Sequence, residues 1–147
     1  MPRAVAAGVD HEPVVTRTIN KHLRIYFAGS IRGGSYDWSI YREIIALLGE
    51  YGTVLTEHVG TSEISVTGED LPDKFIHDRD LGWLQSCDYL IAEVTRPSLG
   101  VGYEIAKASE WGKRVLCIFR PSVTPSLSAM IAGSGVMVAN QRLSCSS

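Results

Sequence analysis

Three short segments of the sequence carry groups that could bind an anion or attack an electrophilic carbon. The first is residues 29–34, GSIRGG, which follow an apolar run and precede a helical pattern. Their glycines let backbone N–H groups turn toward an anion, and Ser30 and Arg32 add a hydroxyl and a guanidinium suited to phosphate. The spacing is neither a Walker loop nor a GxGxxG fingerprint. Phosphate binding is the functional interpretation, and an ordinary glycine-rich connection is the alternative.

The second segment is residues 95–104, TRPSLGVGYE, between a predicted strand and its helix. Ser98 could cap that helix and also donate to an anion at its N-terminus. Gly100 and Gly102 are poor helix formers, so we expect them to let a ligand or another backbone come close. Glu104 lies six residues past Ser98, on the second turn. An isolated Glu on a helix is usually a solvated surface residue, but apolar neighbours here favour a pocket position.

The third segment is residues 77–80, HDRD. A charge run is usually a solvated helix face, yet the helical pattern places Asp80 beside apolar residues. A second carboxylate near Glu104 would give the acid and nucleophile pair that glycosidic chemistry uses. His77 and Asp80 share a helix face, but no third ligand has metal-site spacing, so no metal site is expected. His58 follows the second predicted strand and either lines the same crevice or is structural.

An alternation of strands and helices must position these segments. Apolar runs predict strands at 23–28, 53–55, 89–94, 114–119 and 136–138. Helical spacing predicts helices at 37–51, around 75–84, at 98–111 and at 126–132. Gly52 is expected to end the first of them. Such alternation predicts a single α/β domain, with a doubly wound, mainly parallel, Rossmann-like sheet and helices on both faces. Ligands then bind outside the carboxyl ends of the strands. The loops expected to meet there begin at Gly29, Thr56, Val94 and Arg120, and Glu93 could face the same site.

Length and composition limit the organisation of the chain. With 147 residues, 45% hydrophobic and 20% charged, the sequence fits one globular domain and argues against disorder, collagen or a coiled coil. We expect a flexible tail at 1–21, the domain at 22–140 and a C-terminal tail at 141–147. No run of about 18 apolar residues predicts a transmembrane helix. The first residues carry no apolar segment typical of a secretory signal.

Charge and cysteine content narrow the class of partner and compartment. The net charge of −2 argues against binding to polymeric nucleic acid or a membrane surface, so an anionic ligand must be held locally. Cys87, Cys117 and Cys145 are an odd number without a CxxC pair, which favours reduced thiols inside the cell. We therefore expect a cytoplasmic or nuclear protein in which Cys87 and Cys117 act as small buried apolar residues.

Several strings, taken together and in order, carry a family resemblance over residues 23 to 133. They are YFAGSIRGG at 26–34, GTVLTEHV at 52–59, the matched positions within 76–84, AEVT at 92–95, PSLGVGYE at 97–104, FRP at 119–121 and LSAMI at 127–131. The sequence resembles the 2′-deoxynucleoside 5′-phosphate N-hydrolase family, a branch of the nucleoside 2-deoxyribosyltransferase-like fold. Several long strings in order are far more specific than any one of them.

The resemblance implies hydrolysis of the N-glycosidic bond of 2′-deoxynucleoside 5′-monophosphates, as part of nucleotide metabolism or pool sanitation. Glu104 matches the nucleophile that forms a covalent glycosyl intermediate, Tyr26 lies beside it, and Asp80 lies near the departing base. The resemblance implies no metal or organic cofactor, and a homodimer in which Ser128 reaches the neighbouring phosphate. The substrate-binding positions implied are Ser30, Ile31, Arg32, Gly33, Gly34, His58, Ser98, Gly100 and Ser128.

Three alternatives remain open. Nucleoside 2-deoxyribosyltransferases have an Asp six residues before the catalytic Glu, where it binds a free 5′-hydroxyl; here the position is Ser98, which suits phosphate. A ribonucleotide N-glycosidase on the same fold is not distinguished. A non-catalytic nucleotide-binding module would not need Tyr26, Asp80 and Glu104 together. Residues 135–147 do not match the further strand and C-terminal helix of the family, so we expect intact chemistry but altered stability and dimerisation.

Overall fold

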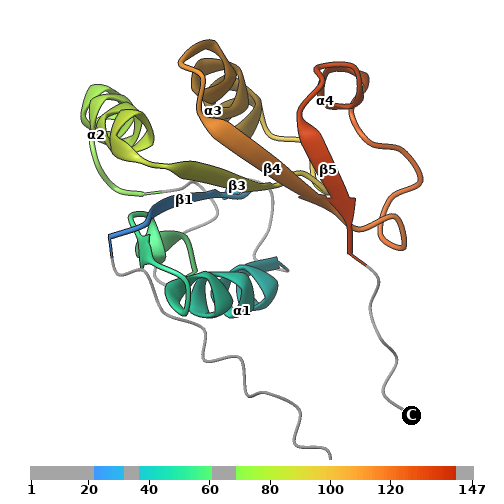
Figure 1. The fold of residues 1–147 in the computed structure, drawn as a ribbon, viewed down its shortest axis with the longest axis horizontal. Coiled ribbons are helices and arrows are strands. Elements are labelled where there is room, and N and C mark those ends of the chain that lie inside the picture. The colour runs from blue at the N-terminus through green and yellow to red at the C-terminus, as the bar shows by residue number, and fades with distance from the viewer. Residues whose placement is uncertain (1–21, 32–36, 61–68, 142–147) are drawn as a thin grey trace, which may run out of the picture.

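A five-stranded parallel sheet forms the centre of the computed structural model, which describes residues 22–31, 37–60 and 69–141. The strands are β1 (Arg24–Ala28), β2 (Thr53–Val54), β3 (Tyr89–Glu93), β4 (Arg114–Phe119) and β5 (Met137–Asn140), in the order β2-β1-β3-β4-β5. The helices are α1 (Trp38–Gly49), the 3-10 helix η2 (Glu57–Gly60), α2 (Asp73–Ser86), α3 (Leu99–Glu110) and α4 (Ala129–Ala132). The predicted doubly wound α/β fold is confirmed (Figure 1). The predicted N-terminal tail, residues 142–147 of the predicted C-terminal tail and positions 32–34 fall outside the described residues. Gln141, the first residue of the predicted C-terminal tail, donates its N–H to the Phe119 carbonyl at 2.7 Å.

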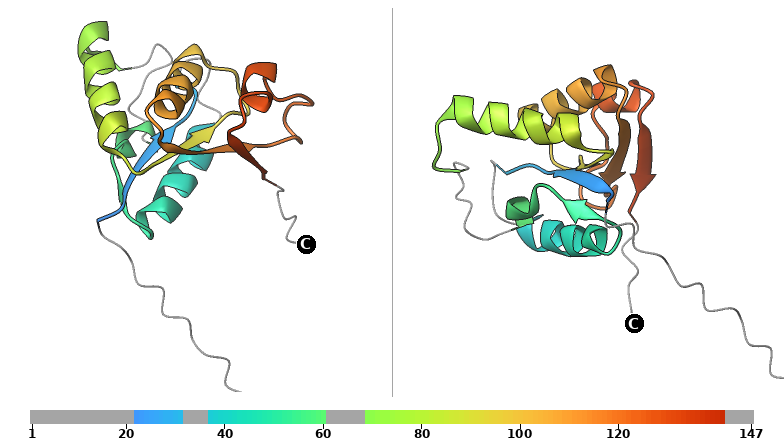
Figure 2. Two further views of the ribbon diagram at one scale, coloured as in Figure 1. Left: turned by 45° about the horizontal axis from the view of Figure 1, so that its top comes forward. Right: turned by 60° about the vertical axis from the view of Figure 1, so that its left-hand side comes forward.

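Helices cover both faces of the sheet because its central strands are apolar on both sides. In β1, Ile25 and Phe27 join the core under α1, whereas Tyr26 and Ala28 join the core under α2 and α3. All four side chains are at most 3% exposed. Continuous apolar strands of this kind are typical of parallel sheets. Figure 2 shows α1 on one side of the sheet, with α2, α3 and α4 on the other.

The strand order places a topological switch point between β1 and β3. The chain leaves β1 through α1 to reach β2 on one side, and leaves β2 through α2 to reach β3 on the other. The two connections therefore lie on opposite faces and diverge at the carboxyl ends of β1 and β3. Ligands of open α/β sheets bind in this crevice. The first and second chemical segments of the sequence follow β1 and β3 directly.

The glycine at position 52, between α1 and β2, has a different role from the one that the sequence suggested. We predicted that Gly52 ends the first helix, but α1 ends at Gly49. Gly52 is instead needed where the chain meets β1, because a Cβ there would lie 2.4 Å from the Leu23 carbonyl oxygen. Gly112, just after α3, has a φ of 70° and supplies the left-handed residue that often ends a helix. Among the described residues, no helix is long and apolar enough to cross a membrane.

A buried threonine completes the hydrogen bonding of β1 beyond the short strand β2. The Thr56 hydroxyl donates to the Phe27 carbonyl at 2.7 Å and accepts from the Phe27 N–H at 2.9 Å. Thr56 is 1% exposed, so water does not replace it easily. The side chain thus substitutes for a strand partner at the point where β1 approaches the switch point.

Replacing Thr56 with Val should therefore destabilise the fold although it keeps the shape. Both Phe27 backbone groups would be buried without partners, which should lower the free energy of unfolding by roughly 2–4 kcal/mol. Urea denaturation measures this change. Thr53→Val, at an exposed position of β2, is the matched control and should change stability by less than about 0.5 kcal/mol. Equal effects of the two substitutions would refute the role given to the Thr56 hydroxyl.

Candidate active site

Tyr26 and Glu104 form the central contact of the site. The Tyr26 hydroxyl donates to Glu104 Oε1 at 2.7 Å, across 78 positions of sequence. Burial raises the pKa of Glu104 to about 7; the Tyr26 hydrogen bond lowers it, and the nearby Asp80 charge raises it. Burial and the adjacent carboxylates raise the pKa of Tyr26 well above its usual value. Tyr26 therefore remains a protonated donor, and Glu104 titrates near neutral pH.

Asp80 adds a second carboxylate from α2. Its side chain is 20% exposed, and Oδ1 accepts from Arg79 Nε at 2.9 Å. Burial raises the pKa of Asp80, and the Arg79 guanidinium opposes that shift. The charge of Asp80 acts on the pKa values of both Tyr26 and Glu104. The fold thus gathers on the α2 and α3 face the three residues to which the resemblance gives catalytic roles.

Arg79 of α2, next to Asp80, contacts Glu69 and Trp83. The sequence analysis did not predict these contacts. The Arg79 guanidinium binds both oxygens of Glu69, at 2.9 and 2.6 Å, and lies 4.8 Å from the Trp83 ring centre. His58 Nε2 is 3.6 Å from Glu69 Oε1, and its ring lies against Trp83. Burial lowers the pKa of His58. The charges of Arg79 and Asp80 also act on the pKa of His58, so His58 lies near Asp80. A role in substrate binding stays a prediction.

The anion-binding predictions fall on the loops after β1 and β3. Ser98 caps α3, where its hydroxyl oxygen accepts the Val101 N–H at 3.3 Å. The hydroxyl proton is then left to donate to a ligand. Ser30 follows β1, and its carbonyl accepts the Tyr41 hydroxyl at 3.3 Å. A Cβ on Gly29 would lie 2.8 Å from the Tyr41 ring, which explains the glycine at that position.

The other predicted binding residues are less directly placed. Ile31 packs against the core on the α1 side. Gly100 lies in the first turn of α3, where a Cβ would meet only Ser98 Oγ at 3.9 Å among the described residues. A Cβ on Gly102 would meet no described atom within 4 Å. No described backbone therefore requires these glycines, and close approach of a ligand stays a prediction. Arg32, Gly33 and Gly34 lie outside the described residues.

A cavity of about 640 Å³ lies between α3 and α4. Apolar side chains including Val101 and Ile105 form much of its wall, and Arg96, Ser98 and Ser128 also line it. Ser128 precedes α4 without capping it. The predicted phosphate residue Ser98 and the predicted subunit-bridging residue Ser128 thus border the same cavity of one chain.

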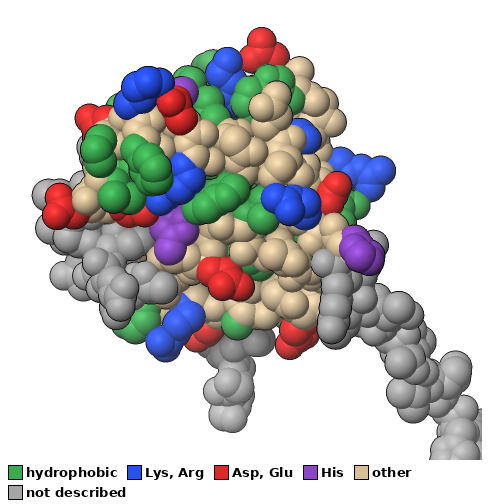
Figure 3. Space-filling model, turned by 90° about the vertical axis from the view of Figure 1, so that its left-hand side faces the viewer, with side chains coloured by type: hydrophobic (Ala, Val, Ile, Leu, Met, Phe, Trp, Pro, Cys, Tyr) green, Lys and Arg blue, Asp and Glu red, His purple; other side chains and the backbone are tan. Residues whose placement is uncertain are grey.

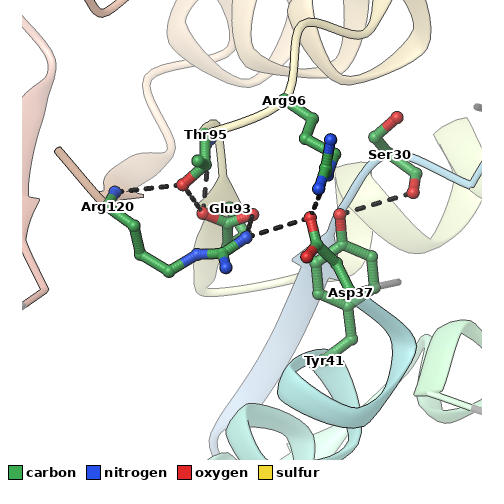
Figure 4. Close-up of polar contacts among 7 residues, drawn as sticks. All are labelled: Ser30, Asp37, Tyr41, Glu93, Thr95, Arg96 and Arg120. Carbon is green, nitrogen blue, oxygen red and sulfur yellow. Dashed lines mark hydrogen bonds and ion pairs between the residues drawn. The ribbon is translucent and has the colours of Figure 1, made fainter. Parts of the chain in front are cut away.

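A buried charge network lies beside the switch point (Figure 4). Glu93, which could have faced the site, is fully buried, and its Oε2 lies 3.4 Å from Arg120 Nη2. Its Oε1 accepts the hydroxyl and the N–H of Thr95, the latter at 3.2 Å. Arg120 Nη2 is also 3.0 Å from Asp37 Oδ2, which accepts Arg96 Nε at 2.6 Å. Sequence reasoning missed this network, because its members lie far apart in the sequence: at the start of α1, at the end of β3 and just after it, and after β4.

Charge on the surface is mixed. On the face in Figure 3, acidic and basic side chains are interspersed with hydrophobic ones. An anionic ligand on this face would therefore depend on hydrogen-bond donors in direct contact with it, because the face has no excess of positive charge. Within the described ranges, no three His, Cys, Asp or Glu side chains are grouped so that they could hold a metal ion.

Fold and site together define a doubly wound α/β protein with a tyrosine–carboxylate site at the switch point of its sheet. Residues 25–144 match the nucleoside 2-deoxyribosyltransferase family, and the chain belongs to that family. It is 56% identical to a 5-hydroxymethyl-dUMP N-hydrolase of Esox lucius over 115 residues, which cover 76% of this chain and 79% of the relative. It is 52% identical to the protein of the same name from Homo sapiens, covering 75% of this chain and 64% of that one.

A solved structure supports the fold independently. The CMP N-glycosidase of Clostridium botulinum superposes with a TM-score of 0.57, covering 80% of this chain and 86% of that chain. The sequence identity is 19%, so the likeness concerns the fold alone. The resemblance stated from the sequence strings is confirmed by the family match and the relatives.

Proposed function

We propose that this protein hydrolyses the N-glycosidic bond of 2′-deoxynucleoside 5′-monophosphates and serves in nucleotide metabolism, where it removes unwanted deoxynucleotides from the pool. The observation that carries the proposal is the Tyr26–Glu104 hydrogen bond beside the Asp80 carboxylate. Relatives that are 52–56% identical and named 5-hydroxymethyl-dUMP N-hydrolase support it. The products are a free base and 2-deoxyribose 5-phosphate.

In the first step, Glu104 attacks the anomeric carbon C1′. Oε1 accepts the Tyr26 hydrogen bond, so Oε2 is the oxygen that forms the new bond. The C1′–N bond breaks, and its electron pair leaves with the base, which takes a proton from solvent. Asp80 faces the departing base, and the ionised Glu104 stabilises the positive charge that develops on the sugar. The result is a glycosyl ester of Glu104.

In the second step, water attacks C1′ and the C1′–Oε2 bond breaks. Glu104 leaves as a carboxylate, and the proton of the water passes to solvent. A 2-deoxyribosyl centre lacks the electron-withdrawing 2′-hydroxyl, so its oxocarbenium-like transition state forms readily. The phosphate is remote from C1′ and supplies binding energy that positions the sugar. Ser98 at the N-terminus of α3 and Ser30 after β1 are the described residues that we assign to it, together with Arg32, Gly33 and Gly34 of the loop that follows.

Ser98 favours a monophosphate over the nucleoside that a transferase binds. A hydroxyl can both cap α3 and donate to phosphate, whereas a carboxylate at this position would repel it. The second candidate function is transfer of deoxyribose between bases, because the matching family is described as nucleoside 2-deoxyribosyltransferase. Ser98 argues against this candidate.

We further propose a homodimer that acts in the cytoplasm or nucleus. The cavity between α3 and α4 brings Ser98 and Ser128 to one apolar surface, which suits a second copy whose Ser128 approaches the phosphate. Cys87 and Cys117 are buried free thiols, which fits a reducing compartment. Sedimentation equilibrium and microscopy of a tagged protein test the two parts separately.

The test of the proposed function is release of free base, separated by chromatography. Substrates are 5-hydroxymethyl-dUMP and the four common deoxynucleoside monophosphates, with the matching deoxynucleosides and ribonucleoside monophosphates. We expect release from deoxynucleoside monophosphates, with a much lower rate from the other two classes. Transfer of deoxyribose to an added base, without net hydrolysis, would favour the transferase. No release from a folded protein would refute the enzyme.

The rate should depend on pH through Glu104. Attack needs the ionised carboxylate, so kcat/KM should fall as pH falls below about 7, the pKa of Glu104. Tyr26→Phe removes the hydrogen bond that lowers this pKa and should move the acidic limb to higher pH. Asp80→Asn removes the charge that raises it and should move the limb to lower pH. The substrate's own titration is common to all three proteins, so shifts in the same direction would contradict this assignment.

A further inference from the structure

We propose that Arg96 is a further phosphate-binding residue, oriented by the buried network built on Asp37. The inference rests on the proposed function, because it concerns the same 5′-phosphate. Three observations carry it: the contact of the Arg96 guanidinium with Asp37, the burial and pairing of Asp37, and the cavity that Arg96 shares with Ser98.

Asp37 holds Arg96 through one edge of its guanidinium. Arg96 Nε donates to Asp37 Oδ2 at 2.6 Å, while the Arg96 side chain is 43% exposed. Among the described residues, no ion pair or hydrogen bond engages the Nη groups of Arg96. Four of its five N–H donors are therefore available, in the fork geometry that binds phosphate oxygens. A guanidinium fixed at Nε and open at Nη is oriented before its ligand arrives.

Asp37 is held in place because its buried carboxylate pairs with both Arg96 and Arg120. It stands at the N-cap position of α1, where Asp usually accepts a helix N–H, yet it makes no capping hydrogen bond. Its side chain is 6% exposed and also pairs with Arg120, which Glu93 holds from β3 (Figure 4). Two carboxylates and two guanidinium groups give the network no net charge.

Arg96 and Ser98 belong to the same short loop between β3 and α3, two positions apart. Both residues line the cavity at the start of α3. A phosphate held by the Ser98 hydroxyl would therefore lie in a cavity that Arg96 also lines.

The experiment measures how much the phosphate adds to affinity. Titration calorimetry of the Glu104→Gln protein, which does not turn over, gives the Kd of 5-hydroxymethyl-dUMP and of its nucleoside. Adding Arg96→Gln should weaken nucleotide binding by about 10–30-fold, as expected for hydrogen bonds to a charged group. Nucleoside binding should change less than twofold. Arg114→Gln, an exposed arginine paired with Tyr89 at the other end of β4, is the charge-matched control and should change neither.

Asp37→Asn tests the orienting role through coupling. It should weaken nucleotide binding alone, and it should add little when Arg96 is already Gln. If Asp37→Asn unfolds the protein, Arg96→Lys is the alternative variant. It keeps the charge without Nε and the fork, and it should give an intermediate loss of nucleotide affinity.

The proposal would be overturned if Arg96→Gln lost equal affinity for nucleotide and nucleoside, if it lost none, or if Arg114→Gln lost as much. A wild-type protein that binds nucleotide through Arg96 but releases no base would refute only the hydrolase, and no nucleotide binding at all would refute both.

Discussion

Glu104→Gln should reduce base release from deoxynucleoside monophosphates by at least about 10³-fold. The substitution removes the attacking carboxylate and the negative charge that faces the anomeric carbon. Two opposite unit charges 4 Å apart attract by about 4 kcal/mol at an effective dielectric constant of 20, which alone corresponds to about 10³-fold in rate. Loss of the covalent route adds to this. The Gln amide oxygen can still accept the Tyr26 hydrogen bond, so the local fold should be retained.

Single-turnover assays with quantified free base measure this loss, and a melting temperature near that of the wild type shows that the variant is folded. Glu110→Gln is the matched control, since Glu110 lies on the same helix with its side chain 68% exposed and paired only weakly with Lys107. It should retain full activity. Intact mass of acid-quenched wild-type protein should reveal the glycosyl ester. Residual activity in Glu104→Gln above one-tenth of the wild type would remove Glu104 from the reaction.

Ser98→Asp should convert a phosphate-binding position into one that rejects phosphate. Like charges 4 Å apart repel by about 4 kcal/mol at an effective dielectric constant of 20. We therefore expect kcat/KM for the monophosphate to fall by about 10²–10³-fold, with most of the loss in KM. Activity on the matching deoxynucleoside should not fall, because its 5′-hydroxyl can donate to the new carboxylate.

Ser98→Asn separates charge from helix capping. Asn and Asp cap helices about as well as Ser, so all three proteins should keep the start of α3. Asn carries no charge, and the loss should stay within about tenfold. Steady-state kinetics on nucleotide and nucleoside for the three proteins give the comparison. If Asn and Asp reduced the nucleotide rate equally, Ser98 would act through the shape of α3 rather than through the phosphate.

Much of the fold could be predicted because its signals are local. The apolar runs of β1, β3 and β4 and the helical spacing of α1 and α3 each span a few residues, and the structure confirms them. The loops that carry Ser30 and Ser98 follow from the same alternation. The reason for Gly52 was predicted wrongly because its close contact is with Leu23, which precedes α1 in the sequence while Gly52 follows it. A helix stop is a local property, whereas that contact exists only after β1 and β2 have paired.

The candidate site likewise combines features with local sequence signals and contacts that form only on folding. Residue type and local spacing pointed to Glu104 after a helix start, to Asp80 on an apolar helix face and to Ser98 at the helix start, and the family resemblance gave each its expected role. The contacts between Tyr26 and Glu104, among Arg79, Asp80 and Glu69, and from Arg96 through Asp37 to Arg120 could be seen only once the chain was folded. Residue type and periodicity are written locally in the chain. Contacts between distant residues depend on the order β2-β1-β3-β4-β5, which sets the strand ends that meet.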